Sequence, residues 1–166
     1  MTLTESSLHF VKSVRLMSDT TSFEDELKKS GVIIHTNKGR SMLPLLREGR
    51  DVMIIKRPEG RLKRYDVALY KQSGKYILHR VLKATEDGYV TCGDHCTERE
   101  YGITDSDVIG VLVGVIRDGK HISTEDFGYR FYSHLWCDLF YIRVFILKIK
   151  FFFQRCLSHV KRKLKK

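Results

Sequence analysis

Short runs of β-branched and aromatic residues, separated by turns that contain glycine, dominate the chain between residues 32 and 120. The pattern predicts strands at 32–36, 52–56, 66–71, 76–84, 89–91 and 108–116. The turns between them fall at 57–60, 72–75, 85–88 and 117–120. Strands joined by such short connections pair with antiparallel neighbours, because a parallel neighbour needs a long crossover. The sequence therefore predicts a mostly β, mostly antiparallel fold in a single domain at 32–122.

A short helical segment is expected before this β-rich region, within residues 1–31. Ser22 is followed by acidic residues at positions 24–26, which is typical of a capped helix N-terminus. Lys28 and Lys29 suit the C-terminal end of that helix, and Gly31 suits its closing cap. Spacings of four and three between apolar residues also favour a helix within residues 1–21.

The turn 39–44 places a serine between a glycine and a proline. Gly39 frees the backbone before Ser41, and Pro44 fixes the chain direction after it. A serine hydroxyl is a weak nucleophile until a base takes its proton, and a neutral imidazole near pH 7 is suited to that role. His79 lies in the predicted strand 76–84, and Asp94 follows the strand 89–91. An acid behind the imidazole would hold its orientation and stabilise the imidazolium.

Five motifs occur in a consistent order: 39–44 with 52–55, then 66–70, 79–81, 93–94 and 108–110. Together they resemble the type I signal peptidase family, over roughly residues 36–117. Within that family the chain is most similar to the branch of the endoplasmic reticulum, archaea and spore-forming bacteria, which uses histidine as its base. The resemblance implies a small coiled β-barrel-like signal-peptidase fold with Ser41 and His79 on one face. It also implies contacts of Met42 and Pro44 with the substrate, and no cofactor.

The acid of the predicted triad has two candidates. In the resembled branch a second aspartate lies six residues after the Gly-Asp motif, and the equivalent position here is Glu100. Glutamate is one methylene longer than aspartate, so it reaches the histidine only if the loop backbone lies slightly further away. Asp94 is the alternative, and it could instead orient the loop. The sequence leaves Glu100 and Asp94 equally supported.

The four cysteines do not suggest a metal site. Cys92 and Cys96 have three residues between them, which differs from the two-residue spacing of common zinc knuckles, and no second ligand pair follows. Reduced thiols are the expected state. A disulfide across the Asp94 loop is the alternative if this face meets an oxidising compartment.

The C-terminal segment 130–166 carries most of the net charge of the chain. It holds ten of the 30 Lys+Arg residues and one acidic residue, Asp138. As one helix, residues 131–153 would span about 34 Å, which is long enough for a bilayer core. Charges interrupt this run, and Arg143 near the bilayer centre would cost about 2.5–3.5 kcal/mol on insertion scales.

On a helical wheel, Arg143, Lys150, Gln154 and Lys161 form a basic strip beside a broad aromatic one. This pattern predicts a helix that lies on the surface of an anionic membrane. Packing on a protein partner or a second copy, and a membrane-spanning segment, are the alternatives. Nucleic-acid binding is not expected, because the aromatic residues cluster away from the lysines.

These features predict a membrane-associated serine endopeptidase acting on a peptide or preprotein. The resemblance implies cleavage of a signal or leader peptide after a small residue. No N-terminal membrane anchor is evident in the sequence, so the side of the cell membrane stays undetermined. The main alternative is a catalytically inactive peptide-binding module of the same fold, which the glutamate at position 100 favours. A self-cleaving repressor is disfavoured because it would use a lysine base and a DNA-reading helix pair.

Overall fold

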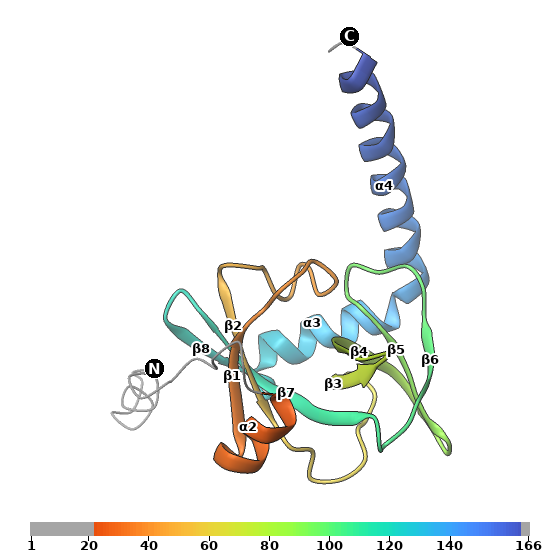
Figure 1. Ribbon diagram of the computed structural model, residues 1–166. Helices are drawn as coiled ribbons and strands as arrows, with labels where there is room; N and C mark the ends of the chain where they lie inside the picture. The colour runs from red at the N-terminus through yellow and green to blue at the C-terminus, as the bar shows by residue number, and fades with distance from the viewer. Residues whose placement is uncertain (1–21, 164–166) are drawn as a thin grey trace.

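The computed structural model describes residues 22–163, and a curved antiparallel sheet forms its body (Figure 1). Seven strands follow the order β1-β2-β7-β3-β4-β5-β6, and β8 pairs with β7. Their bounds are β1 Val32–Thr36, β2 Asp51–Lys56, β3 Val67–Gln72, β4 Lys75–Thr85, β5 Gly88–Cys92, β6 Glu100–Ile103, β7 Val108–Arg117 and β8 Lys120–Ser123. All the pairings are antiparallel. The predicted mostly β fold is confirmed.

Helix α2, Phe23–Ser30, has the predicted caps. The Ser22 hydroxyl accepts a hydrogen bond from the Asp25 backbone N–H at 3.1 Å. Gly31 closes the helix at φ 72°, a left-handed conformation that glycine adopts at no steric cost. The helix predicted within residues 1–21 lies outside the described residues.

Both faces of the sheet are buried at β3, which explains why the first four residues of this strand, Val67 to Tyr70, are all apolar. In β3, Val67 and Leu69 join a core that also holds Leu46 and Ile55. The alternate residues Ala68 and Tyr70 join a second core, with Val81 and Tyr89 among its members. Successive side chains of a strand point to opposite faces, so these two cores lie on the two sides of the sheet.

The C-terminal segment forms two helices where the sequence predicted one. Helix α3 is Phe127–Asp138, and α4 is Phe140–Lys163, with the break at Leu139. Tyr129, Ser133 and Cys137 of α3 repeat every four residues and are buried against the sheet. α3 is therefore part of the core, whereas α4 stands out from the body of the domain (Figure 1).

Arg143 does not lie on an exposed basic strip of α4, as the helical wheel had predicted. Its side chain is buried, and its guanidinium donates to the carbonyl oxygen of Asp94 at 3.3 Å. The reason is that the first turns of α4 pack on the loop after β5, which no local pattern reveals. Within residues 22–163, no helix is both long enough and apolar enough to cross a membrane.

Candidate active site

Ser41 lies in the connection between β1 and β2. Gly39, at φ 95°, makes the left-handed turn that precedes it. After Ser41 the backbone forms a turn, in which the Leu46 N–H donates to the Met42 carbonyl at 2.8 Å. The Ser41 carbonyl accepts a hydrogen bond from the His95 N–H at 2.7 Å. That bond joins the serine turn to the loop after β5.

Asp51, at the start of β2, fixes the other end of this connection. Its carboxylate accepts hydrogen bonds from Arg50 and Arg117 and from the Arg47 N–H. Burial alone would raise the pKa of Asp51, but these donors outweigh it and hold the pKa at about 2. The serine turn is thus anchored by a carboxylate that stays ionised.

Met42 and Pro44, for which the resemblance implies substrate contacts, both lie in the turn after Ser41. Met42 is 1% exposed and belongs to the core around Leu46. Pro44 is exposed, and neither residue lines the cavity beside Ser41. In the turn after Ser41, the Met42 side chain points into the domain and contributes to packing.

His79 on β4 pairs with Glu100 at the start of β6. Imidazole Nδ1 lies 2.9 Å from the Glu100 carboxylate. The Tyr70 hydroxyl donates to the same carboxylate, and Thr91 bonds to it at 3.3 Å. Burial alone would raise the pKa of Glu100, but the bonds from Tyr70, His79 and Thr91 lower it. A carboxylate is therefore held against one ring nitrogen of a buried histidine.

The other ring nitrogen, Nε2, faces Ser41 across Gly93. A β-carbon built on Gly93 would lie 2.9 Å from His79 Nε2 and 2.7 Å from the Ser41 carbonyl oxygen. Ser41 and His79 also line one cavity of about 640 Å³, together with residues of β1 and the first half of β4. No hydrogen bond joins the Ser41 hydroxyl to the His79 ring within the described residues. Catalytic hydrogen bonds are often long until substrate binds.

Asp94 makes a different set of contacts. It is fully buried and accepts hydrogen bonds from Nε and Nη2 of Arg80, each at 2.8 Å. Tyr132 of α3 donates to its carboxylate at 2.9 Å, and Trp136 donates to its backbone carbonyl at 2.9 Å. Within the described residues, no hydrogen bond or ion pair joins Asp94 to His79. Of the two acids that the sequence left open, Glu100 contacts the histidine and Asp94 holds the loop to α3.

Tyr70 and Thr91 were missed by the sequence reasoning. A signal for Tyr70 was present: in the predicted hairpin around 72–75, Ala68 pairs with His79, so Tyr70 lies diagonally across from His79 on the same face. Thr91 pairs with Glu100 through β6, a strand that the sequence did not predict. Its role therefore had no local signal.

The cysteines are free thiols within the described residues, and no cluster there could hold a metal ion. Cys92 is buried, and burial raises the pKa of its thiol to about 11. Cys96 borders the same space as His79, since its Sγ would lie 2.8 Å from a β-carbon on Gly93. Burial also raises the pKa of Cys96.

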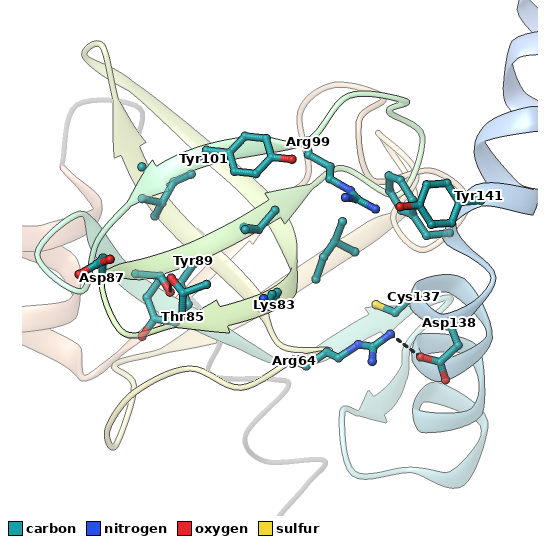
Figure 2. A pocket seen from close by; sticks show the side chains of 16 residues that line it. Arg64, Lys83, Thr85, Asp87, Tyr89, Arg99, Tyr101, Cys137, Asp138 and Tyr141 are labelled. Carbon is teal, nitrogen blue, oxygen red and sulfur yellow. Dashed lines mark hydrogen bonds and ion pairs between the residues drawn. The ribbon is translucent and has the colours of Figure 1, made fainter.

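A second cavity, of about 780 Å³, lies away from Ser41 and His79 (Figure 2). It opens between β4, β5 and β6 and the junction of α3 with α4.

Searches against family models, curated proteins and solved structures find no match to this chain. The function is therefore argued from the site itself.

Proposed function

We propose that this protein is a serine endopeptidase in which Ser41 is the nucleophile, His79 the general base and Glu100 the acid that orients the base. The observation that carries the proposal is the His79–Glu100 bond of 2.9 Å through Nδ1. It leaves Nε2 on the side of Gly93 and Ser41. A nucleophile, a base and an orienting acid in this order are the parts that acyl transfer requires.

In the proposed reaction, Ser41 Oγ attacks the carbonyl carbon of the scissile peptide bond while His79 Nε2 takes its proton. Glu100 stabilises the imidazolium, and the Ser41 backbone N–H helps to hold the oxyanion. The C–N bond then breaks, and His79 returns the proton to the leaving amine. A water molecule, deprotonated by His79, hydrolyses the acyl-serine ester, which releases the new carboxylate and regenerates Ser41.

The cavity beside Ser41 suits an extended peptide. His35 and Thr36 of β1 line one side, and Ile77 and Leu78 of β4 line the other. Among the described residues, β1 stands at one end of the strand order and pairs with β2. A peptide added as a strand would gain affinity from the backbone and selectivity from alternate side chains. The sequence resemblance supports a signal or leader peptide, cleaved after a small residue, as the substrate.

An acyl-serine probe tests the proposal directly. A fluorophosphonate should label the wild-type protein, and labelling should disappear in Ser41→Ala. Ser106→Ala is the matched control, because Ser106 is an exposed residue in the turn before β7, and it should label normally. His79→Ala should slow labelling by about 10²–10⁴-fold. If the folded wild type is not labelled but still binds an extended peptide, the non-catalytic module is the better description.

A further inference from the structure

Helix α4 has two unlike faces. Phe140, Arg143 and Leu147, spaced by three and four residues, are buried, and Arg143 donates to the Asp94 carbonyl in the loop after β5. Phe151 continues this face and packs edge-on against the ring of His95. Contact with the domain therefore uses one side of the helix only.

The opposite side of α4 forms an apolar stripe that no described residue covers. At 100° per residue its members cover an arc of about 160°, centred opposite Phe140, Leu147 and Phe151. Their exposed fractions range from 42% to 75%. The members are Tyr141, Ile142, Phe145, Ile146, Ile149, Phe152, Phe153 and Leu157. Contiguous exposed apolar surface of this kind marks an interaction site.

Charge indicates what the apolar stripe contacts. Residues 140–163 contain no aspartate or glutamate. Lys148 and Lys150 are exposed and lie at the two borders of the stripe. A second copy packed on the stripe would bring like-charged borders together, which destabilises helix pairing. An anionic lipid surface would instead contact the apolar residues with its acyl chains and the lysines with its headgroups.

The domain end of the apolar stripe supplies a further cation. Arg99 points from the β6 side of the second cavity toward Tyr141 (Figure 2). Its guanidinium carbon lies 4.5 Å from the Phe140 ring centroid and 5.3 Å from that of Tyr141. No carboxylate within the described residues lies within ion-pair distance of Arg99. By contrast Arg64, on the same cavity, is neutralised by Asp138 at 2.7 Å.

We propose that the apolar stripe of α4 docks on an anionic bilayer surface, with a headgroup phosphate held by Arg99 at the mouth of the second cavity. The rings of Phe140 and Tyr141 both contact Arg99 and restrict its guanidinium, and Tyr141 connects it to the stripe. The partner is thus an anionic phospholipid. This inference does not depend on the peptidase reaction, and it stands or fails separately.

Vesicle co-sedimentation of the full chain tests the docking. We expect binding to phosphatidylcholine vesicles with one-third phosphatidylglycerol to be at least about tenfold tighter than to pure phosphatidylcholine. Ile149→Glu should weaken anionic binding at least about 30-fold, because it puts a charge in the middle of the apolar stripe. Gln154→Glu is the matched control: it adds the same charge off the stripe and should cost about fivefold or less.

Three results would overturn the docking proposal. The first is equal binding to neutral and anionic vesicles, and the second is equal loss in Ile149→Glu and Gln154→Glu. The third is a stable dimer that Ile149→Glu dissociates, with no vesicle binding. Urea unfolding monitored through Trp136, which contacts the loop after β5, checks that each variant is folded.

Arg99→Gln tests the headgroup contact. It should weaken binding to anionic vesicles by about fivefold and leave binding to neutral vesicles unchanged. Soluble glycerol phosphate in millimolar excess should compete in the wild type if the phosphate group alone is recognised, and should not compete if the bilayer is required. An unchanged affinity of Arg99→Gln for anionic vesicles would exclude Arg99 from the docking surface.

Discussion

His79 and Arg80 are consecutive residues of β4, yet they serve the two faces of the strand in different ways. Each pairs with a carboxylate: His79 with Glu100 and Arg80 with Asp94. The side chains of Arg80 and Asp94 are both 0% exposed, whereas Glu100 is 32% exposed. The Arg80–Asp94 pair is shielded from solvent, whereas the His79–Glu100 pair borders a cavity. A pair that exchanges protons with a substrate must be accessible to that substrate. A pair that only joins structural elements can be fully buried.

The bonds around each pair support this division. Arg80 donates to Asp94 twice, and its remaining nitrogen reaches the Tyr65 carbonyl and the Ser133 hydroxyl. Burial alone would lower the pKa of Arg80, but Asp94 raises it well above its usual value. Such a pair costs desolvation to form, so its main effect is to join β4 to α3 in one arrangement.

The largest expected effect comes from Gly93→Ala, because Gly93 adjoins both pairs. The new methyl group would lie 2.7 Å from the Ser41 carbonyl, 2.8 Å from Cys96 Sγ and 2.9 Å from His79 Nε2. All three separations are below van der Waals contact, so the serine turn and the ring must move apart. Because misplacement of about 1 Å costs about 10²-fold, and two partners move, we expect labelling by the acyl-serine probe to fall at least about 10³-fold.

Gly128→Ala is the control for this substitution, since a β-carbon there meets nothing within 4 Å. It should label at the wild-type rate and fold at least as stably. Wild-type labelling of Gly93→Ala would contradict the placement of His79 Nε2 beside the serine turn.

Asp94→Asn should give the largest loss of stability. Without the carboxylate, the Arg80 guanidinium is a buried charge with no compensating acid, which typically costs about 3–5 kcal/mol. Urea unfolding monitored through Trp136 measures the change, since Trp136 contacts the Asp94 backbone. The double variant Arg80→Met with Asp94→Leu should recover most of the loss, because it removes both charges. If the free energy of unfolding of Asp94→Asn falls by less than about 1 kcal/mol, Asp94 does not have the structural role described above.

The sequence could predict the fold class, and it singled out two residues, Ser41 and His79, that line the same cavity. Strands and turns follow from local patterns, and Ser41 and His79 stand in motifs whose order is informative. The sequence could not predict which of Asp94 and Glu100 contacts His79 and which holds the loop to α3. This division depends on β6, a strand of four residues that includes Gly102, and on α3, which reaches Asp94 from 38 residues further along the chain.

The C-terminal segment shows the same limit. Its long apolar run, with charged residues at helical spacing, predicts one continuous helix, and no proline or glycine marks the break at Leu139. The helix divides because Tyr129, Ser133 and Cys137 pack on the sheet, and Phe140 begins a face that packs on the loop after β5. Periodicity therefore gives the apolar faces of these helices, but their partners come from tertiary contacts.

Glu100→Gln tests whether the His79–Glu100 pair affects activity more than stability, in contrast to the Arg80–Asp94 pair. The amide keeps the shape of the side chain but cannot stabilise an imidazolium, so we expect the labelling rate to fall by about 10²-fold. Stability at pH 7 should change much less than in Asp94→Asn, because Glu100 is partly solvated. Glu100→Asp should give an intermediate rate, since the shorter side chain draws the carboxylate away from Nδ1. A rate loss in Asp94→Asn at full stability, with none in Glu100→Gln, would reverse the assignment.

The smallest expected effect is the pH dependence of the Glu100 contribution to stability. The pKa of Glu100 is lowered below its usual 4.5 in the folded protein, so the ionised form is favoured by folding. The stability difference between wild type and Glu100→Gln should therefore be constant above pH 4.5 and shrink as the pH falls through the folded pKa. Urea unfolding at intervals from pH 7 to pH 3 measures it.

Asp51→Asn is the control for this titration. Because the pKa of Asp51 is held at about 2, its contribution should persist further into acid than that of Glu100. If the stability difference between wild type and Glu100→Gln grows as the pH falls, the folded protein favours the protonated form of Glu100. Glu100 would then be unable to stabilise an imidazolium at His79, and the contrast between the two faces of β4 would have to be reconsidered.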